Sequence, residues 1–283
     1  MKGKICLILS AFIYGVAPLL AKIAYGGGAN VMTLTFLRTF MTLPLLYIIM
    51  KLRGQSFRIS VRDFYRIAAL ALVGGTLTNL ALYTAYSYIP TGLATTLHFI
   101  YPLIIISASS FVYHEHIKLT QIIAAALVTG GIAMFASLGG ADKTGVMLAL
   151  LSGVLYSFYV VYMDYSGIDG MDYIKLTFYL MIMMSAGTLV FGAATNSISF
   201  SDMDVTGWTF SAFISLLVTA FALPLFQIGV RQEGASTAGI VSAFEPITTL
   251  IMGAAFLGES MSAMQYVGTA VIIIGVTVAE KYA

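Results

Sequence analysis

The amino-acid sequence predicts an all-α membrane protein with ten transmembrane helices, arranged as two inverted five-helix repeats. Three observations lead to this fold class. Of the 283 residues, 59% are hydrophobic and only 9% are charged, and the mean hydropathy is +0.94. Long apolar runs follow one another with short connections. The second half of the chain also repeats the residue pattern of the first half.

The composition requires lipid as the main solvent of the folded chain. A soluble domain carries about 25% charged residues, and a single core cannot hide this much apolar surface from water. About 20 apolar residues span a bilayer as a helix. The runs lack the alternation of barrel strands, so helices are favoured. The expected spans are residues 4–24, 31–51, 66–88, 92–112, 119–138, 145–164, 173–194, 208–230, 235–257 and 262–280.

Several protein classes receive no support from the sequence. The net charge of +2 is too small to imply nucleic-acid binding, and the single cysteine, Cys6, excludes an internal disulfide. The basic start of the chain resembles a signal peptide, but no small-residue cleavage site follows, so we expect a retained first helix. The connections are too short for a nucleotide-binding domain, and no P-loop, HExxH or GxSxG motif is present. We therefore expect neither an enzyme nor a bound cofactor.

An internal repeat organises the chain. A shift of 144 residues places Tyr101 on Glu245, and a shift of 142 residues places Tyr14 on Tyr156. An odd number of spans in each repeat turns the second copy upside down in the membrane. Inverted repeats with a site near the midplane are the architecture of secondary transporters. The expected repeats are residues 1–138 and 143–283.

Basic residues predict the orientation in the membrane, because Lys and Arg concentrate in cytoplasmic connections. With the N-terminus placed inside, the outer ends of the spans carry only Lys22 and Lys143. Both termini are then expected in the cytoplasm. The expected inner ends carry Lys2, Lys4, Lys51, Arg53, Arg58, Arg62, Arg66, Lys118, Lys175, Arg231 and Lys281.

The stretch Ala238–Pro246 places a carboxylate, Glu245, deep inside an apolar run. Glu245 lies about nine residues into its span, or roughly 13 Å at 1.5 Å per residue. An acid at the centre of a bilayer helix costs about 2.5–3.5 kcal/mol on insertion scales, so it is expected to face a cavity or a partner. We interpret Glu245 as a site for a substrate cation or a proton. The alternative is a structural hydrogen-bond acceptor between helices.

The equivalent stretch of the first repeat is Ala94–Pro102. It has His98 where the second repeat has Ser242, and Tyr101 where the second repeat has Glu245. Positions three residues apart share one face of a helix, so the two polar stripes are expected to form two walls of one cavity. His98 either relays protons or is a neutral histidine hydrogen-bonded between helices.

Further candidate cavity residues lie in the first three spans and the sixth. Arg38 lies about eight residues into the second span and either extends to the surface, pairs with an acid, or holds an anionic group of the substrate. Tyr14 and Tyr156 are repeat mates, and Asn79 and Tyr83 lie in the third span. These residues are candidates to line an aromatic cavity, although a single tyrosine more often serves packing.

Two loop glutamates and one histidine pair have other interpretations. Glu115 and Glu259 follow their apolar runs and are expected to be caps or inter-helix anchors. His114 and His116 flank Glu115, but alternate residues do not share a helix face, so a metal site is not expected there.

The chain resembles the EamA-type branch of the drug/metabolite transporter superfamily over its whole length. The resemblance rests on Leu37-Arg38, on Ala94–Pro102 followed by Glu115, and on Ala238–Pro246 followed by Leu257-Gly258-Glu259. In the first repeat, Tyr113-His114-Glu115 departs from the Leu-Gly-Glu pattern. The resemblance implies a ten-helix inverted-repeat fold with a central cavity. It also implies movement of small metabolites such as amino acids or amines, often outward.

The sequence therefore predicts a secondary transporter in the cytoplasmic membrane, with a small-molecule substrate and the lipid bilayer as partners. Proton-coupled export of an amino acid or organic amine by alternating access is the leading hypothesis. A nucleotide-sugar or lipid-linked carrier, an intramembrane enzyme using Glu245 and His98, and a membrane sensor remain as alternatives. A homodimer is left open. The expected substrate-binding residues are Glu245, His98, Tyr101, Ser242, Tyr14, Tyr156, Asn79, Tyr83 and Arg38.

Overall fold

A computed structural model describes most of the chain, and every structural statement below refers to the residues it describes. These are residues 2–101, 103–104, 119–120, 123, 126–127, 130–131, 142–166, 168, 170–233, 241–242, 244–260 and 262–281. Pro102, the loop residues His114, Glu115 and His116, and most of the expected spans 92–112 and 119–138 lie outside this set. The expected number of ten spans therefore stays a prediction.

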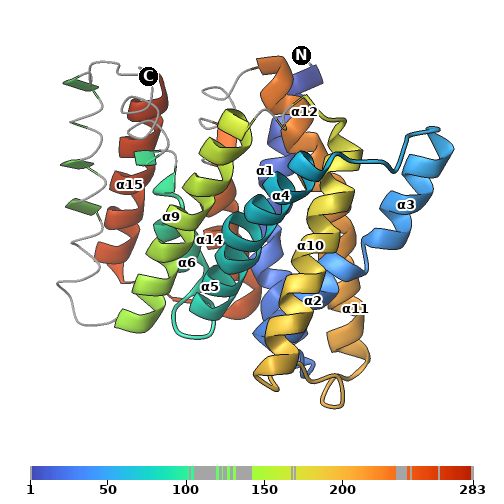
Figure 1. Ribbon diagram of the computed structural model, residues 1–283. Helices are drawn as coiled ribbons and strands as arrows, with labels where there is room; N and C mark the ends of the chain where they lie inside the picture. Colours follow the sequence, from blue (N-terminus) through green and yellow to red (C-terminus); the bar gives the residue numbers. More distant parts are fainter. Residues whose placement is uncertain are drawn as a thin grey trace.

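The described part of the chain is built from helices (Figure 1). Six helical segments are long and apolar enough to cross a membrane: Lys2–Gly26, Val31–Leu52, Val61–Ala85, Lys143–Met163, Tyr173–Ala194 and Val205–Gly229. The helices are α1 Lys2–Gly26, α2 Val31–Phe40, α3 Leu43–Leu52, α4 Val61–Ala69, α5 Thr78–Ala85, α6 Thr91–His98, α9 Lys143–Ser166, α10 Tyr173–Ala194, α11 Val205–Ile214, α12 Leu223–Glu233, α14 Phe244–Leu257 and α15 Ala263–Lys281.

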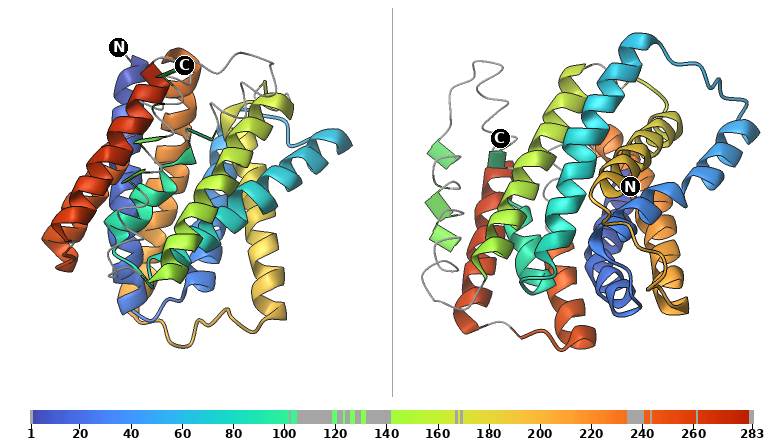
Figure 2. Two further views of the ribbon diagram at one scale, coloured as in Figure 1. Left: turned by 90° about the vertical axis from the view of Figure 1, so that its left-hand side faces the viewer. Right: turned by 60° about the horizontal axis from the view of Figure 1, so that its bottom comes forward.

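The arrangement brings segments from both halves of the sequence into contact. Helix α1 packs along α11, α12 and α14, and α9 packs against α5 and α6. Helix α10 packs against α2. The first and last described residues lie at the same end of the molecule (Figure 1). Figure 2 shows α15 at one edge of the bundle and the connection between α3 and α4 at the opposite edge.

Five of the described helices, α2, α4, α9, α10 and α11, begin where a polar side chain caps the first turn. The side chain of Asn30 accepts the Thr33 N–H at 2.8 Å before α2, and Asp204 accepts the Gly207 N–H at 2.9 Å before α11. Such caps satisfy backbone donors that have no partner within the helix. The third span was expected to begin at residue 66, but α4 begins at Val61, because the Ser60 side chain caps it by accepting the Asp63 N–H at 3.0 Å. The first turn of α4 is polar, so the apolar run in the sequence begins later than the helix does.

Both copies of the third span contain wider π-helical turns. They occupy η1 Leu70–Leu77 in the first repeat and η2 Ser215–Ala222 in the second, 145 residues apart. Pro224 lies two residues after the end of η2 and lacks the backbone donor that would bond to the carbonyl four residues earlier. In η1, Gly74 and Gly75 form the centre of the stretch. Such π-helical turns often occur at functional sites, and both face the cavity described below.

Glu259 anchors the start of α6, as the sequence predicts for this residue. Its carboxylate oxygens accept the Thr91 backbone N–H at 3.1 and 2.9 Å, and one of them accepts the Thr91 hydroxyl at 2.8 Å. An anion at a helix N-terminus is stabilised by the orphan N–H groups and by the helix dipole. Gly253 leaves room for this contact, because a Cβ there would lie 2.5 Å from a Glu259 oxygen. Helix α6 is therefore fixed to the second repeat.

Two sets of loop contacts join the halves at opposite ends of the bundle. At one end, the Asn30 side chain donates to the Ser197 carbonyl at 2.9 Å, and the Thr33 hydroxyl donates to the Ser199 carbonyl at 3.0 Å. At the other end, the Lys175 ammonium donates to the Arg58 carbonyl at 2.6 Å. The connection that follows the second span of one repeat therefore contacts the start of the second span of the other repeat, and this holds at both ends of the bundle.

A glycine sets the close approach of α1 to α14, which carries Glu245. A Cβ at Gly15 would lie 2.7 Å from the Glu245 carbonyl oxygen and 2.5 Å from the Thr248 Cβ, and the Gly15 carbonyl accepts the Thr249 hydroxyl at 3.0 Å. We expect Gly15→Ala to lower stability by about 1–3 kcal/mol through overpacking. Gly26→Ala is the matched control, since a Cβ there meets nothing within 4 Å. Equal melting temperatures of the two purified variants would contradict this interpretation.

Candidate functional site

A central cavity of about 130 Å³ lies between the two halves. Its walls come from α1, α2, η1, α5 and α6 of the first half and from α9, α10, η2, α12 and α14 of the second. All nine residues that the sequence nominated for substrate binding line this cavity: Tyr14, Arg38, Asn79, Tyr83, His98, Tyr101, Tyr156, Ser242 and Glu245. The structure thus brings the nominated residues together, while their role in binding stays a prediction.

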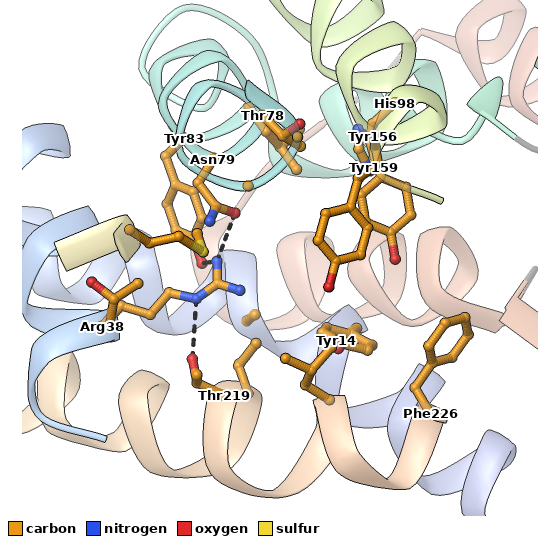
Figure 3. A pocket seen from close by; sticks show the side chains of 18 of the residues that line it. Tyr14, Arg38, Thr78, Asn79, Tyr83, His98, Tyr156, Tyr159, Thr219 and Phe226 are labelled. Carbon is orange, nitrogen blue, oxygen red and sulfur yellow. Dashed lines mark hydrogen bonds between the residues drawn. The ribbon is translucent and has the colours of Figure 1, made fainter. Parts of the chain in front are cut away.

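Arg38 is held inside the bundle and does not extend to the surface. Its Nη1 donates to the Asn79 side-chain oxygen at 3.0 Å and to the Tyr83 hydroxyl at 2.9 Å. Its Nε donates to the Thr219 hydroxyl at 3.5 Å. Figure 3 shows the contacts from α5 and the contact from η2 on opposite sides of the guanidinium, with the remaining nitrogen directed toward the tyrosines. Residues of both third spans therefore fix the position of one partly buried cation.

Glu245 lines the same cavity from α14. Its side chain is half-buried, and neither carboxylate oxygen has a hydrogen-bond or ion-pair partner among the described residues. The alternative role as a structural acceptor between helices therefore finds no donor in the described part of the chain. The carboxylate faces space that a cation, a proton or water can occupy.

Aromatic rings form one wall between α6 and α9. The ring centroids of Tyr101 and Tyr156 are 4.7 Å apart, and Tyr156 stacks on Tyr159 at 5.7 Å with an interplanar angle of 7°. Figure 3 shows the hydroxyl ends of Tyr156 and Tyr159 pointing into the space bounded by Arg38 and Tyr14. Such rings present apolar faces and electron-rich surfaces to a bound cation.

His98 bridges α6 to α9. Its Nδ1 lies 2.8 Å from the Ser152 hydroxyl oxygen, and that hydroxyl donates to the Ala149 carbonyl at 2.6 Å. A hydroxyl has a single proton, so Ser152 accepts from His98 and the Nδ1 carries the hydrogen. The contact joins α6 to α9, as the alternative of a histidine hydrogen-bonded between helices predicts, and the proton relay stays a prediction.

The His98–Ser152 contact predicts that substitutions at two equivalent positions of the repeats, Ser152 and Ser10, differ in their effect on stability. Ser152→Ala leaves the buried Nδ1–H of His98 without its acceptor, which costs about 1–3 kcal/mol. Ser10→Ala is the matched control, because Ser10 is the repeat mate of Ser152 and bonds only within α1, to the Leu7 carbonyl at 2.8 Å. We expect Ser152→Ala to lower the melting temperature more than Ser10→Ala does. An equal fall in melting temperature for both variants would show that the contact between His98 and Ser152 does not stabilise the protein.

Sequence reasoning missed several lining residues. The most important is Thr219, which binds Arg38. The repeat could have identified Thr219. This residue lies in the expected span 208–230, which is equivalent to the span of the first repeat that carries Asn79 and Tyr83. Other lining residues are apolar and indistinguishable from core positions in the sequence, among them Leu180, Met181, Met184, Leu223 and Phe226.

Comparison with known proteins agrees with this architecture. Residues 1–137 and residues 143–279 each match the model of the EamA-like transporter family. The chain belongs to this family. Membership confirms the resemblance noted in the sequence and identifies the molecule as a multi-pass membrane protein of a transporter family.

Individual members of the EamA-like family are distant in sequence. The uncharacterized transporter YcbK of Bacillus subtilis is 22% identical over 279 residues, covering 94% of this chain and 88% of the relative. An uncharacterized transporter of Synechocystis sp. is 24% identical over 198 residues, which is 68% of this chain and 59% of that relative's length. A protein of known crystal structure shares the fold, with a TM-score of 0.73, 15% identity and coverage of 99% of this chain and 98% of that chain.

Proposed function

We propose that the protein is a secondary active transporter that carries a small amino acid or organic amine across the cytoplasmic membrane. The observation that carries this proposal is the Glu245 carboxylate, which lines a central cavity without a hydrogen-bond or ion-pair partner among the described residues. An acid at this depth is costly, and such residues mark substrate, ion and proton pathways. The direction is export, coupled to protons that compete for the same carboxylate.

The arrangement supports transport by alternating access. The cavity lies between two copies of one helical unit, the position where inverted-repeat transporters hold their substrates. Helix α6 ends at His98, beside the cavity, and does not continue as a regular helix through Phe99 and Ile100. Broken helices of this kind expose backbone polar groups where they line a cavity. Rocking of the two units around this point would open the cavity to each side in turn.

The cavity favours a small cationic group in the substrate. Its volume of about 130 Å³ is close to that of an engineered cavity of roughly 150 Å³ that binds benzene. Tyr14, Tyr156 and Tyr159 supply aromatic surface near Glu245, which suits an ammonium group. A nucleotide-sugar carrier needs several cations for its phosphates, and Arg38 is the only Lys or Arg among the described lining residues.

Transport by purified protein tests this proposal. Proteoliposomes containing the protein, with an imposed proton gradient, are loaded in turn with the twenty amino acids and with small primary amines. We expect saturable movement of at least one of these compounds, together with a rise in the melting temperature, because a ligand of the folded state raises apparent stability. Movement of none of them by folded protein would contradict the proposal.

A further inference from the structure

One nitrogen of the Arg38 guanidinium, Nη2, has no hydrogen-bond partner among the described residues. An arginine has five N–H donors. The Nε hydrogen is directed to Thr219, and the two Nη1 hydrogens are directed to Asn79 and Tyr83. Nη2 keeps two hydrogens without a partner in the described part of the chain, and this nitrogen is not sealed by protein atoms. It points toward the tyrosines of the cavity (Figure 3).

The same cavity holds the opposite charge at another wall. Glu245 has no hydrogen-bond partner among the described residues, and it attracts Arg38 across the cavity without coming within ion-pair distance of it. Opposite charges that share one cavity attract each other, so they are expected to form an ion pair unless something holds them apart. The hydrogen bonds to Asn79, Tyr83 and Thr219 provide that restraint, because they hold Nη1 and Nε in place. The cavity is thus left with an unfilled anion position and an unfilled cation position.

We propose that Nη2 of Arg38 binds the carboxylate of the substrate while Glu245 and the tyrosines bind its ammonium group. This inference rests on the proposed transport function and narrows it to substrates that carry both groups. The cavity of about 130 Å³ suits a small zwitterion. Simple amines lack the group that Arg38 requires, and the carrier discriminates against them.

The charges of the cavity also decide which anion suits Arg38. A carboxylate carries one negative charge, which one guanidinium balances with a charge-assisted hydrogen bond. A phosphate group carries more charge and would meet the Glu245 carboxylate in the same space without a second fixed cation among the described lining residues. The site therefore selects a carboxylate. Asn79, Tyr83 and Thr219 are positioning residues, since they act on the substrate only through Arg38.

Matched derivatives of one compound test the wild-type protein first. L-alanine is compared with ethylamine and L-alanine methyl ester, which lack the carboxylate, and with N-acetyl-L-alanine, which lacks the ammonium group. If another amino acid raises the melting temperature more, its own derivatives are used. We expect each single loss to weaken binding about ten- to 150-fold, the range for a lost hydrogen bond to a charged group. Equal affinity for the amino acid and its methyl ester would overturn the proposal.

Substitutions at the anion position test the residue itself. Arg38→Gln is expected to weaken binding of the amino acid at least tenfold relative to binding of the amine, so the preference for a carboxylate disappears. Tyr83→Phe keeps the charge but removes one bond that holds it, and is expected to reduce the preference by a smaller factor. Arg53→Gln is the matched control, because Arg53 lies at the end of α3 and bonds the Tyr173 hydroxyl at 3.2 Å. Retained preference in folded Arg38→Gln would overturn the proposal.

The outcomes separate this inference from the proposed function. Transport of amines as well as amino acids, with no effect of Arg38→Gln on their ratio, would overturn the zwitterion site and leave the transporter intact. Transport of none of the compounds would overturn both. The comparison of L-alanine with its derivatives uses wild-type protein. It therefore tests the zwitterion site even if the Arg38→Gln variant does not fold.

Discussion

Glu245→Gln is expected to weaken substrate binding about ten- to 150-fold and to abolish movement of protons with the substrate. The substitution keeps the size and shape of the side chain and removes its charge. A hydrogen bond to a charged group contributes about 1.5–3 kcal/mol, which corresponds to this range of affinity. The fold is expected to tolerate the change, since the carboxylate bonds no described residue. Uptake into proteoliposomes and substrate-dependent pH changes are the measurements.

The control for this variant is an acid outside the cavity. Asp63 lies in the exposed first turn of α4 and pairs with Arg66 at 3.8 Å. Asp63→Asn removes the same charge and is expected to leave affinity and coupling unchanged. If folded Glu245→Gln transports with wild-type affinity and still moves protons, the carboxylate has no part in the mechanism.

The second large effect is expected on stability, from Glu259→Ala. The substitution leaves the Thr91 N–H and hydroxyl without the carboxylate that accepts both. Loss of a hydrogen bond to a charged group costs about 1.5–3 kcal/mol, and a change of 1 kcal/mol shifts the melting temperature of a chain of 150–250 residues by about 2–4 °C. We therefore expect the melting temperature to fall by roughly 3–12 °C. Transport falls as well, because α6 carries His98 into the cavity wall.

A graded series of variants checks this account of Glu259. Thr91→Val removes the hydroxyl but keeps the backbone N–H, so it is expected to cost about 1 kcal/mol, less than Glu259→Ala. Adding Glu259→Ala to Thr91→Val should then cost less than Glu259→Ala alone, because the two residues share one contact. Fully additive losses would show that Glu259 stabilises the protein through some other contact.

Much of the fold and the composition of the cavity could be predicted from the sequence. Apolar runs indicate where the chain crosses lipid, and the expected seventh span, 173–194, coincides with α10. Glu245 was identifiable because a charge inside an apolar run is energetically costly and therefore indicates a functional site. Tyr14 and Tyr156 were identifiable because the repeat places them at matching depth. Glu245 stands out because it is charged within an apolar run. The two tyrosines stand out because the same residue type occurs at equivalent positions of the two repeats.

The remaining features depend on how helices approach one another. The hydrogen bonds of Arg38 come from α5 and η2, which are distant in sequence, so no local pattern encodes them. The π-helical turns arise from local geometry around Pro224 and Gly74 and leave the apolar pattern unchanged. Ser152 looks like any small residue of a membrane helix, and only the approach of α6 to α9 makes it the partner of His98.

Water access to position 245 tests the central claim most directly. Single cysteines are introduced by Glu245→Cys and, as a control, by Ile251→Cys, both in a Cys6→Ser background. Ile251 lies on the outer face of α14, with 61% of its surface exposed to the expected lipid. A charged thiol reagent dissolved in water is predicted to modify the thiol introduced at position 245 rapidly and the one introduced at position 251 barely at all. Reaction at position 245 no faster than at position 251 would contradict a water-filled cavity beside this carboxylate.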